Sequence, residues 1–431
     1  MHYFSTNRRS PDATFREATL GGQPADKGLY FPSEIPRVDG NFVETLSGHS
    51  KESIAFKVIH PFVGGEIPDD RLFEICSETV TFDFPLVEIS DRIFTLELFH
   101  GPTLAFKDVG ARFMSRCLSY FSEDRPQKTI VIVATSGDTG GAVAAGFHNV
   151  EGVEVVILYP KGKVSKVQEL QLTTLGGNVT ALEVRGVFDD CQALAKRALA
   201  DSEITDRVHL TSANSINVAR WLPQQFYYFY ALKQWPFDEL PVISVPSGNF
   251  GNIASGILAK ASGLPIKTFI AACNANDVVP RFLLTGEYRA KPSVETLSNA
   301  MDVGDPSNFV RILETLGSDK EKICETLEAA SVSDETTAET MREVYKRYGY
   351  TLDPHGAVGY RSLIDRLNQR PDEKGIFLET AHPVKFASVE DILGTTPRIP
   401  ESVRKLFSRE KQSIEIDADY SAVKEILLSK I

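Results

Sequence analysis

The sequence of 431 residues has few cysteines, and they are not arranged in pairs. There are five, an odd number, widely spread and without a CxxC spacing: Cys76, Cys117, Cys191, Cys273 and Cys324. This pattern argues against a disulfide framework and against a cysteine-based zinc site. We therefore expect reduced thiols in a cytoplasmic protein and predict no metal centre.

Long apolar runs are also missing. No stretch approaches the roughly 18 apolar residues of a membrane-spanning helix, and the first ten residues lack the apolar core of a secretory signal. We therefore expect no membrane partner. The formal net charge of -12 disfavours nucleic acid as a partner, although it still allows a locally basic pocket for an anionic substrate.

One lysine is notable for its neighbours. Lys107 follows a Gly-Pro turn and the apolar residues 104–106. Partial desolvation there would disfavour the ammonium form and leave an amine able to form a Schiff base. The alternative is a surface lysine that caps a turn, since lysine is rarely buried without a partner.

Two segments each read as a buried strand, a glycine loop and a helix. In residues 241–261 the loop contains Gly248 and Gly251, which permit close backbone approach, so the first helical turn could bind a phosphate. The loop lacks the ending of a nucleotide P-loop and the third glycine of a dinucleotide fingerprint, so neither ATP nor NAD is favoured. A plain strand-to-helix turn remains the alternative.

The second such segment is residues 129–147. Its loop could grip a carboxylate or phosphate through hydroxyls and amides, while Asp138 accepts a hydrogen bond or helps to cap the helix. Capping alone would also explain these residue types.

Strand-like and helix-like segments alternate through the middle of the chain. Strands are predicted at residues 153–158, 179–184, 266–273 and 375–380, and helices at 164–175, 189–201 and 223–233. Residues 318–343 are predicted as charged surface elements. Such alternation indicates parallel sheets covered by helices, with ligands bound where strands end.

Together these segments resemble threonine synthases, pyridoxal-phosphate enzymes with the tryptophan-synthase-β type of fold (fold type II). The resemblance rests on residues 19–22, 27–32, 98–108, 134–140, 212–217, 245–251, 299–304, 306–309 and 380–386. It implies an N-terminal helical domain (residues 1–92) and two parallel-sheet α/β domains that close on the cofactor. The large, cofactor-binding domain would comprise residues 93–118 and 210–431, and the small one residues 119–209.

The resemblance also implies site residues. Lys107 would carry pyridoxal 5'-phosphate as a Schiff base, and Thr380 would be the hydroxyl partner of the pyridine nitrogen, although Thr380 could instead cap the following turn. The cofactor phosphate would lie on a loop formed by Gly248, Asn249, Phe250, Gly251 and Asn252. A neutral hydroxyl cannot hold the nitrogen protonated as a carboxylate would, so the electron sink would be mild.

The implied substrate is O-phospho-L-homoserine, which carries two anionic groups. Those groups would be bound by Ser136, Gly137, Asp138 and Thr139 and by Asn214, Ser215 and Arg220, whose guanidinium suits a phosphate. Many enzymes of the wider fold have Asn where this chain has Asp138, which leaves open a hydrogen bond to the cofactor's ring oxygen.

The implied reaction is a γ-elimination followed by water addition at Cβ, giving L-threonine and phosphate, with Lys107 as the base. One alternative is a phospho-lyase on the same scaffold, which releases a 2-oxo acid and ammonia instead. The other is a binding protein that has kept the fold without catalysis, which the intact Lys107 disfavours.

Overall fold

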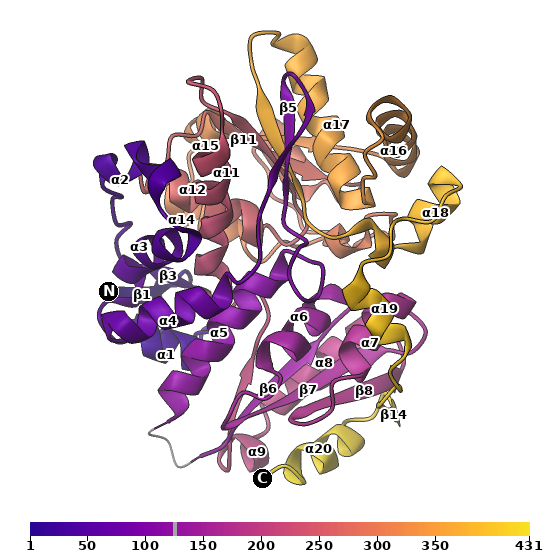
Figure 1. The fold of residues 1–431 in the computed structure, drawn as a ribbon. Coiled ribbons are helices and arrows are strands. Elements are labelled where there is room, and N and C mark those ends of the chain that lie inside the picture. Colours follow the sequence, from indigo (N-terminus) through magenta and orange to yellow (C-terminus); the bar gives the residue numbers. More distant parts are fainter. Residues whose placement is uncertain (124–126) are drawn as a thin grey trace.

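The computed structural model describes residues 1–123 and 127–431, and two largely parallel sheets dominate it (Figure 1). One sheet has six strands in the order β12-β11-β10-β13-β5-β4, and the other has five in the order β14-β8-β7-β6-β9. The fold confirms the predicted α/β class. The first sheet comprises β4 (Leu86–Ser90), β5 (Ile93–Glu97), β10 (Val242–Pro246), β11 (Thr268–Cys273), β12 (Leu327–Ser331) and β13 (Gly375–Glu379), and the second β6 (Thr129–Ala134), β7 (Val153–Pro160), β8 (Val179–Arg185), β9 (His209–Ser212) and β14 (Ile414–Asp417).

The N-terminal segment is not only helical, because it also holds a three-stranded antiparallel sheet, β2-β1-β3. Its apolar side chains belong to the same core cluster as the helix that follows Lys107 and the aromatic residues 226–230. The segment therefore packs directly on the α/β part of the chain. It comprises β1 (His2–Ser5), β2 (Ala13–Thr14), α1 (Phe15–Gly21), β3 (Tyr30–Pro32), α2 (Gly40–Glu44), η1 (Leu46–Gly48), α3 (Lys51–Val63) and α4 (Asp69–Thr79).

Helices cover both sheets. One core cluster lies between the five-stranded sheet and α8 with α20, and another lies between the six-stranded sheet and α16, α17 and α18. None of the described helices is both long and apolar enough to cross a membrane. The remaining helices are α5 (Lys107–Ser122), α6 (Asp138–Phe147), α7 (Lys166–Thr173), α8 (Phe188–Leu199), α9 (Ser202–Thr205), α10 (Val218–Trp221), η2 (Leu222–Gln225), α11 (Phe226–Gln234), α12 (Gly251–Ala261), α13 (Val278–Thr285), η3 (Asn299–Met301), α14 (Phe309–Leu316), α15 (Lys320–Thr326), α16 (Asp334–Tyr348), α17 (Pro354–Gln369), η4 (Pro383–Lys385), α18 (Ala387–Leu393), α19 (Glu401–Phe407) and α20 (Tyr420–Leu428).

Two strands lie where the sequence interpretation did not expect them. The C-terminal β14 pairs in parallel with β8, so the end of the chain returns to the five-stranded sheet although residues 210–431 were assigned to the large domain (Figure 1). Likewise, residues 318–343 contain β12, an edge strand paired with β11, as well as surface helices. Both strands are short and lie at sheet edges, where the local pattern carries little information about pairing. Residues 124–126, inside the predicted small domain, lie outside the described residues.

The predicted loops all follow the carboxyl ends of strands. Neighbouring strands β10 and β13 end at Pro246 and Glu379, just before the glycine loop and Thr380. In the other sheet, β6 ends just before residues 135–137, and α6 begins at Asp138. Parallel strands expose their carboxyl ends at one edge, and this edge is where α/β folds bind ligands.

Candidate active site

Lys107 is the first residue of α5 and follows a turn closed by its own neighbours. The buried Asp108 carboxylate accepts hydrogen bonds from the Thr103 backbone N at 2.9 Å and from Thr103 Oγ1 at 2.6 Å. The half-buried Lys107 has its Nζ 5.7 Å from the centre of the Phe106 ring. The turn therefore fixes where the amine emerges.

The electrostatic surroundings of Lys107 favour a neutral amine. Burial lowers its pKa, Asp138 opposes this effect, and the positive charges of Lys385 and Arg220 lower the pKa further. These three charged groups come from α6, η4 and α10, which are far apart in the sequence. The fold thus gathers one carboxylate and three basic groups around a single site.

Asp138 and Lys385 form a buried ion pair across this site. Their charged atoms lie 2.7 Å apart, and both side chains are 5% exposed or less. Lys385 Nζ also donates to the Thr103 carbonyl at 2.8 Å, and Gln168 Nε2 donates to Asp138 Oδ1 at 2.9 Å. Burial opposes ionisation of Asp138, but Lys385 and Lys107 hold its pKa well below the usual range. Sequence reasoning did not single out Lys385, although it lies within residues 380–386, one of the segments behind the family resemblance.

The glycine loop has the geometry of an anion cradle. Phe250 adopts a left-handed conformation (φ 61°) directly before α12, and its ring packs edge-on against Phe309. An added Cβ at Gly248 would lie 2.5 Å from the Met301 Cα, so only glycine fits there. At Gly251 an added Cβ would make only ordinary van der Waals contacts, the nearest at 3.6 Å from Asn308 Nδ2, so a small side chain would be tolerated there. The first N-H groups of a helix such as α12 suit a phosphate.

Polar side chains continue from the loop toward Ser215. Asn249 Nδ2 donates to Ser215 Oγ at 2.8 Å, and Asn308 Nδ2 donates to the same oxygen at 3.3 Å. Asn252 is turned the other way, because its Oδ1 accepts from the hydroxyl of Tyr228 at 2.8 Å. Its buried Nδ2 has no partner among the described residues and is a donor available to a bound group.

Arg220 is buried, and its guanidinium is only partly used. Its Nη1 donates to the Ala213 carbonyl at 2.6 Å, whereas its Nε has no hydrogen-bond partner among residues 1–123 and 127–431. Burial lowers its pKa to about 10, so it stays charged at neutral pH. An added Cβ at Gly110 would lie 3.2 Å from Arg220 Nε, which sets the guanidinium beside the first turn of α5, close to Lys107. A buried cation with a free donor is suited to an anionic ligand.

The backbone of Thr380 is hydrogen-bonded to the residue before Lys107. Its carbonyl accepts from the Phe106 backbone N at 2.9 Å, and Ala105 and Ala381 form an isolated bridge. Burial lowers the pKa of the nearby His382 to about 4, so this imidazole is neutral. Among the remaining predicted residues, Ser136 is exposed, Gly137 is buried, and Thr139 and Asn214 are half-buried.

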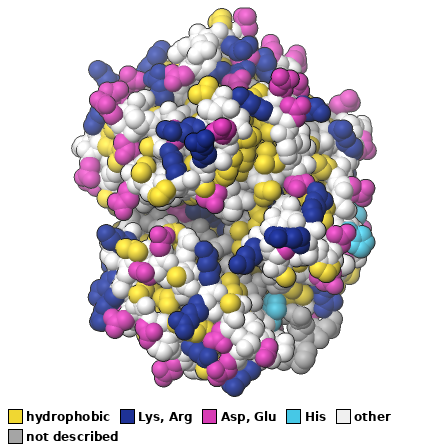
Figure 2. Space-filling view, turned by 180° about the vertical axis from the view of Figure 1, so that it is seen from behind, with side chains coloured by type: hydrophobic (Ala, Val, Ile, Leu, Met, Phe, Trp, Pro, Cys, Tyr) yellow, Lys and Arg dark blue, Asp and Glu magenta, His cyan; other side chains and the backbone are white. Residues whose placement is uncertain are grey.

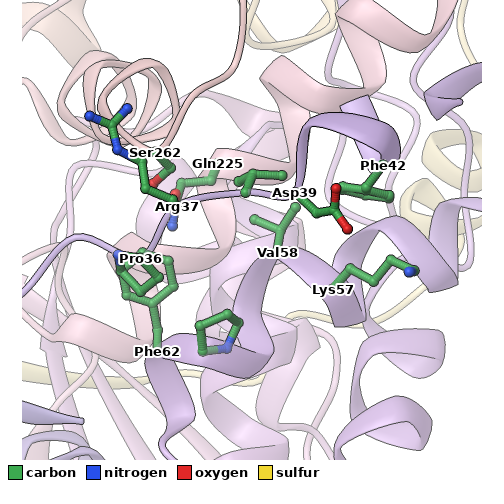
Figure 3. Close-up of a pocket in the computed structure, with 11 residues that line it drawn as sticks. Pro36, Arg37, Asp39, Phe42, Lys57, Val58, Phe62, Gln225 and Ser262 are labelled. Carbon is green, nitrogen blue, oxygen red and sulfur yellow. The ribbon is translucent and has the colours of Figure 1, made fainter. Parts of the chain in front are cut away.

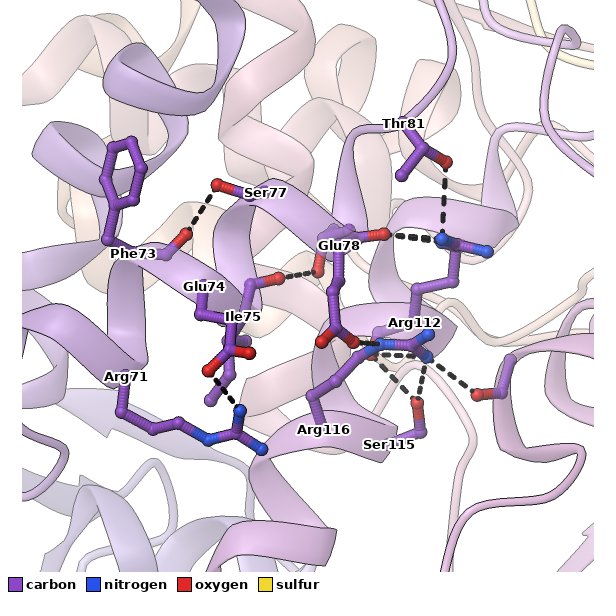
Figure 4. A network of polar contacts seen from close by, with 12 residues as sticks. Arg71, Phe73, Glu74, Ile75, Ser77, Glu78, Thr81, Arg112, Ser115 and Arg116 are labelled. Atoms are coloured by element: carbon purple, nitrogen blue, oxygen red, sulfur yellow. Dashed lines mark hydrogen bonds and ion pairs between the residues drawn. The ribbon is translucent and has the colours of Figure 1, made fainter.

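A polar network holds α5 in place (Figure 4). Arg116 Nε donates to the Glu78 carboxylate at 2.9 Å, and Arg112 Nε donates to the Glu78 backbone carbonyl at 3.1 Å. Arg116 also reaches the Gly146 carbonyl of α6 at 3.0 Å. The network therefore ties the helix that begins at Lys107 to α4 on one side and to α6 on the other.

A cavity of about 210 Å³ lies elsewhere, against the N-terminal segment (Figure 3). It is lined by Pro36, Arg37, Val38, Asp39, Phe42, Lys57, Val58, Pro61, Phe62, Gln225 and Ser262, none of which is a predicted site residue. The charged ends of Arg37 and Lys57 lie on opposite sides of the view and do not converge. By contrast, Figure 2 shows a hollow between the upper and lower halves of the molecule, with Lys and Arg side chains gathered beside it.

The geometry fits pyridoxal phosphate with an anionic substrate. The amine is supplied by a half-buried lysine with a lowered pKa. Two anion contacts are supplied by Asn252 Nδ2 and Arg220 Nε, which have no partner among the described residues. Residues 85–377 match the family described as "Pyridoxal-phosphate dependent enzyme". The fold also resembles maize serine racemase, at 19% identity and a TM-score of 0.57 over 75% of this chain and 96% of that one. The chain is thus a fold type II pyridoxal-phosphate enzyme.

Both ends of the chain define the family more narrowly. Residues 2–80 match "Threonine synthase N terminus" and residues 356–427 match "Threonine synthase, C-terminal". The chain belongs to the threonine synthase family. It is a pyridoxal-phosphate-dependent lyase with threonine synthase activity on a small-molecule substrate.

Relatives and solved structures agree along the whole chain. Threonine synthase from Escherichia coli (strain K12) is 43% identical over 434 residues, covering 100% of both chains, and its crystal structure matches with a TM-score of 0.91. Threonine synthase from Pseudomonas aeruginosa is 37% identical over 96% of this chain and 95% of the relative. A PLP-bound threonine synthase structure from Brucella melitensis matches with a TM-score of 0.92 at 36% identity, covering 99% of this chain and 98% of that one.

Proposed function

We propose that the substrate is O-phospho-L-homoserine, which reacts with water to give L-threonine and phosphate, and that Lys107 holds the cofactor. The observation that carries this proposal is the convergence of Asp138, Lys385 and Arg220 on the half-buried Lys107. A substrate with a carboxylate and a phosphate needs such a basic, partly desolvated site. We further propose that the enzyme works in the cytoplasm without a nucleic-acid or membrane partner.

In this proposal the two ends of the cofactor are bound by different groups. Gly248, Asn249, Phe250, Gly251 and Asn252 cradle its phosphate. Fixed amide dipoles suit that dianion because they do not titrate. Thr380 faces the pyridine nitrogen with a neutral hydroxyl.

Substrate binding uses the remaining predicted residues. Asn214, Ser215 and Arg220 bind the substrate phosphate, and the start of α6 binds the α-carboxylate through Ser136, Gly137 and Thr139. Asp138, already paired with Lys385, is the residue of this loop that does not bind an anion directly. It supports the site by keeping the Lys385 charge compensated.

The chemistry needs a base that is neutral at working pH. When bound, pyridoxal phosphate supplies an electron sink that stabilises negative charge on the substrate carbons. Burial and the positive charges of Lys385 and Arg220 lower the pKa of Lys107, so its amine can take the Cα proton. Arg220 stabilises the departing phosphate through a charge-assisted contact. The electrons that expel phosphate from Cγ come from loss of a Cβ proton, and Cγ is then reprotonated. Water finally adds its hydroxyl at Cβ while a proton returns to Cα.

The test of the Lys107 assignment is borohydride reduction followed by peptide mapping. We expect the pyridoxyl group on Lys107 in the native enzyme. Lys385 is a suitable internal comparison, because it is also buried and borders the same site. Label on Lys385 or on any other lysine would overturn the assignment, and Lys107→Ala should abolish turnover.

A further inference from the structure

Three carboxyl groups meet at the carboxyl end of β13, and one of them has little hydrogen-bond support. Glu379 is fully buried, and neither of its carboxyl oxygens makes a well-formed hydrogen bond among the described residues. The backbone N-H of Asp353 acts on this carboxyl group, but it is the smallest of the influences on the pKa of Glu379. Glu97 lies directly beside it in register on β5, and Asp353 approaches from the start of α17. An added Cβ at Gly356 would lie 2.1 Å from Glu379 Oε1, so the Glu379 carboxyl group packs directly on the first turn of α17.

The other two carboxyl groups are well supplied as anions. Asp353 Oδ1 accepts from the His355 backbone N at 2.8 Å and from the His355 ring Nδ1 at 2.5 Å. Glu97 accepts from the Tyr350 hydroxyl at 2.8 Å and from His100 Nε2 at 2.6 Å. Against the effect of burial, the His355 contacts lower the pKa of Asp353.

Both ring nitrogens of His355 are engaged with groups other than Glu379. Its Nε2 accepts a hydrogen bond from the Ala300 backbone N at 3.2 Å, and its Nδ1 faces Asp353. The imidazole therefore has no ring nitrogen left to donate to Glu379. An ionised Glu379 would be a buried charge beside Asp353, which is strongly unfavourable.

We propose that Glu379 works as a neutral carboxylic acid that donates its proton to Asp353, and that this acid pair positions both ends of the cofactor cradle. Burial and the adjacent Asp353 raise the pKa of Glu379 well above its usual range, in keeping with this state. Two carboxyl groups that share one proton are a familiar outcome of such proximity. The positioning part rests on the proposed roles of Lys107, Gly248 and Thr380.

The acid pair is connected to the cradle at two places. On one side, Glu379 precedes Thr380, whose carbonyl holds the backbone N of Phe106, the residue before Lys107. On the other side, His355 holds Ala300, and the adjacent Met301 packs against Gly248. A change in the Glu379–Asp353 contact would therefore shift Lys107, which is proposed to hold the cofactor, relative to the phosphate loop at Gly248.

Infrared spectroscopy of the holoenzyme tests the protonation state. The difference spectrum between the native enzyme and Glu379→Gln should contain a protonated carboxyl C=O band at neutral pH. Glu373→Gln is the matched control, because Glu373 is also buried but pairs with Arg366 and Lys267, and it should leave that band unchanged. A difference spectrum with only carboxylate bands would show that Glu379 is ionised and would overturn the proposal.

Cofactor affinity tests the positioning part. Glu379→Gln keeps an N-H donor for Asp353 and should bind pyridoxal phosphate within about threefold of the native affinity. Glu379→Leu has no donor and should bind about tenfold more weakly, as expected for one lost buried hydrogen bond. The native affinity should fall at alkaline pH as Glu379 ionises, whereas that of Glu379→Gln should not follow this fall. Equal affinities of the Gln and Leu variants would refute the positioning role.

If Glu379→Leu does not fold, the positioning role is decided by the alkaline fall in native cofactor affinity and its absence in Glu379→Gln. Asp353→Asn then tests the shared proton separately. It keeps side-chain oxygen for the helix cap but removes the negative charge, so the Glu379 band should titrate at lower pH than in the native enzyme. An unchanged titration would overturn the shared proton. Failure of these tests is distinct from failure of the proposed function, because neither measurement uses substrate and lysine mapping is a separate result.

Discussion

Replacing Arg220 by alanine should separate substrate binding from cofactor binding. Arg220 is 3% exposed, and among the described residues its Nε makes no hydrogen bond while its Nη1 donates to one carbonyl. We therefore expect the unpartnered Nε to bind the substrate phosphate. Cofactor binding should not depend on this contact. The visible absorbance of the lysine-bound cofactor should survive in Arg220→Ala while kcat/KM collapses.

The size of this effect follows from the burial of Arg220. Truncating one partner of a buried charged pair costs on the order of 2 to 5 kcal/mol, which corresponds to a roughly 30- to several-thousand-fold loss in kcat/KM. Arg220→Lys should recover only part of it, because a point charge cannot reproduce the planar fork. The assay is steady-state phosphate release from O-phospho-L-homoserine.

Arg311 provides a matched control for burial. It is also fully buried, and its Nε likewise has no partner among the described residues, but both of its terminal nitrogens are used. Nη1 donates to the Ser215 carbonyl at 3.0 Å and Nη2 to the Ile216 carbonyl at 2.8 Å. Arg311→Ala should therefore lower thermal stability and disturb cofactor and substrate binding together. Near-normal kcat/KM in Arg220→Ala would show that Arg220 is structural and that the phosphate site lies elsewhere.

Further predictions concern the loops and the buried ion pair. Gly251→Val should lose at least about tenfold in cofactor affinity, because it adds a branched side chain to the proposed phosphate loop. Gly248→Ala should instead cost about 1 to 3 kcal/mol of stability through its clash with Met301. In denaturant unfolding, Asp138→Asn should cost about 3 to 5 kcal/mol, and adding Lys385→Met should recover much of this loss. The pKa of Asp138 is lowered in the fold, so its contribution is complete above the unfolded value of about 3.9 and is lost as the pH falls below it. The stability difference between the native enzyme and Asp138→Asn should therefore shrink in acid, and a constant difference would refute the assignment.

The sequence pattern was most informative where local chemistry determines structure. The strands before Gly248 and Asp138 and the helices after them occur as predicted, because apolar runs, glycine loops and capping residues are local signals. That these loops follow the carboxyl ends of parallel strands was predictable for the same reason. The roles of the predicted site residues stay predictions until the variants above are made.

Contacts that depend on tertiary structure were not predictable in this way. Lys385 and Asp138 are far apart in the chain but form an ion pair. Nothing in the sequence around either residue indicates which charged residue it will meet. Glu379 read as part of an apolar strand, and its unusual state depends on Asp353 approaching from another element. The edge strand β14 was missed because four residues carry too little pattern to specify a sheet.

The most direct test of the account is the product formed from O-phospho-L-homoserine in water enriched in oxygen-18. The account predicts L-threonine and phosphate in equal amounts, with the heavy oxygen in the threonine hydroxyl group, and no product from Lys107→Ala. Release of phosphate with a 2-oxo acid and ammonia would instead indicate the phospho-lyase reaction. Threonine without the heavy oxygen would contradict the addition of water at Cβ.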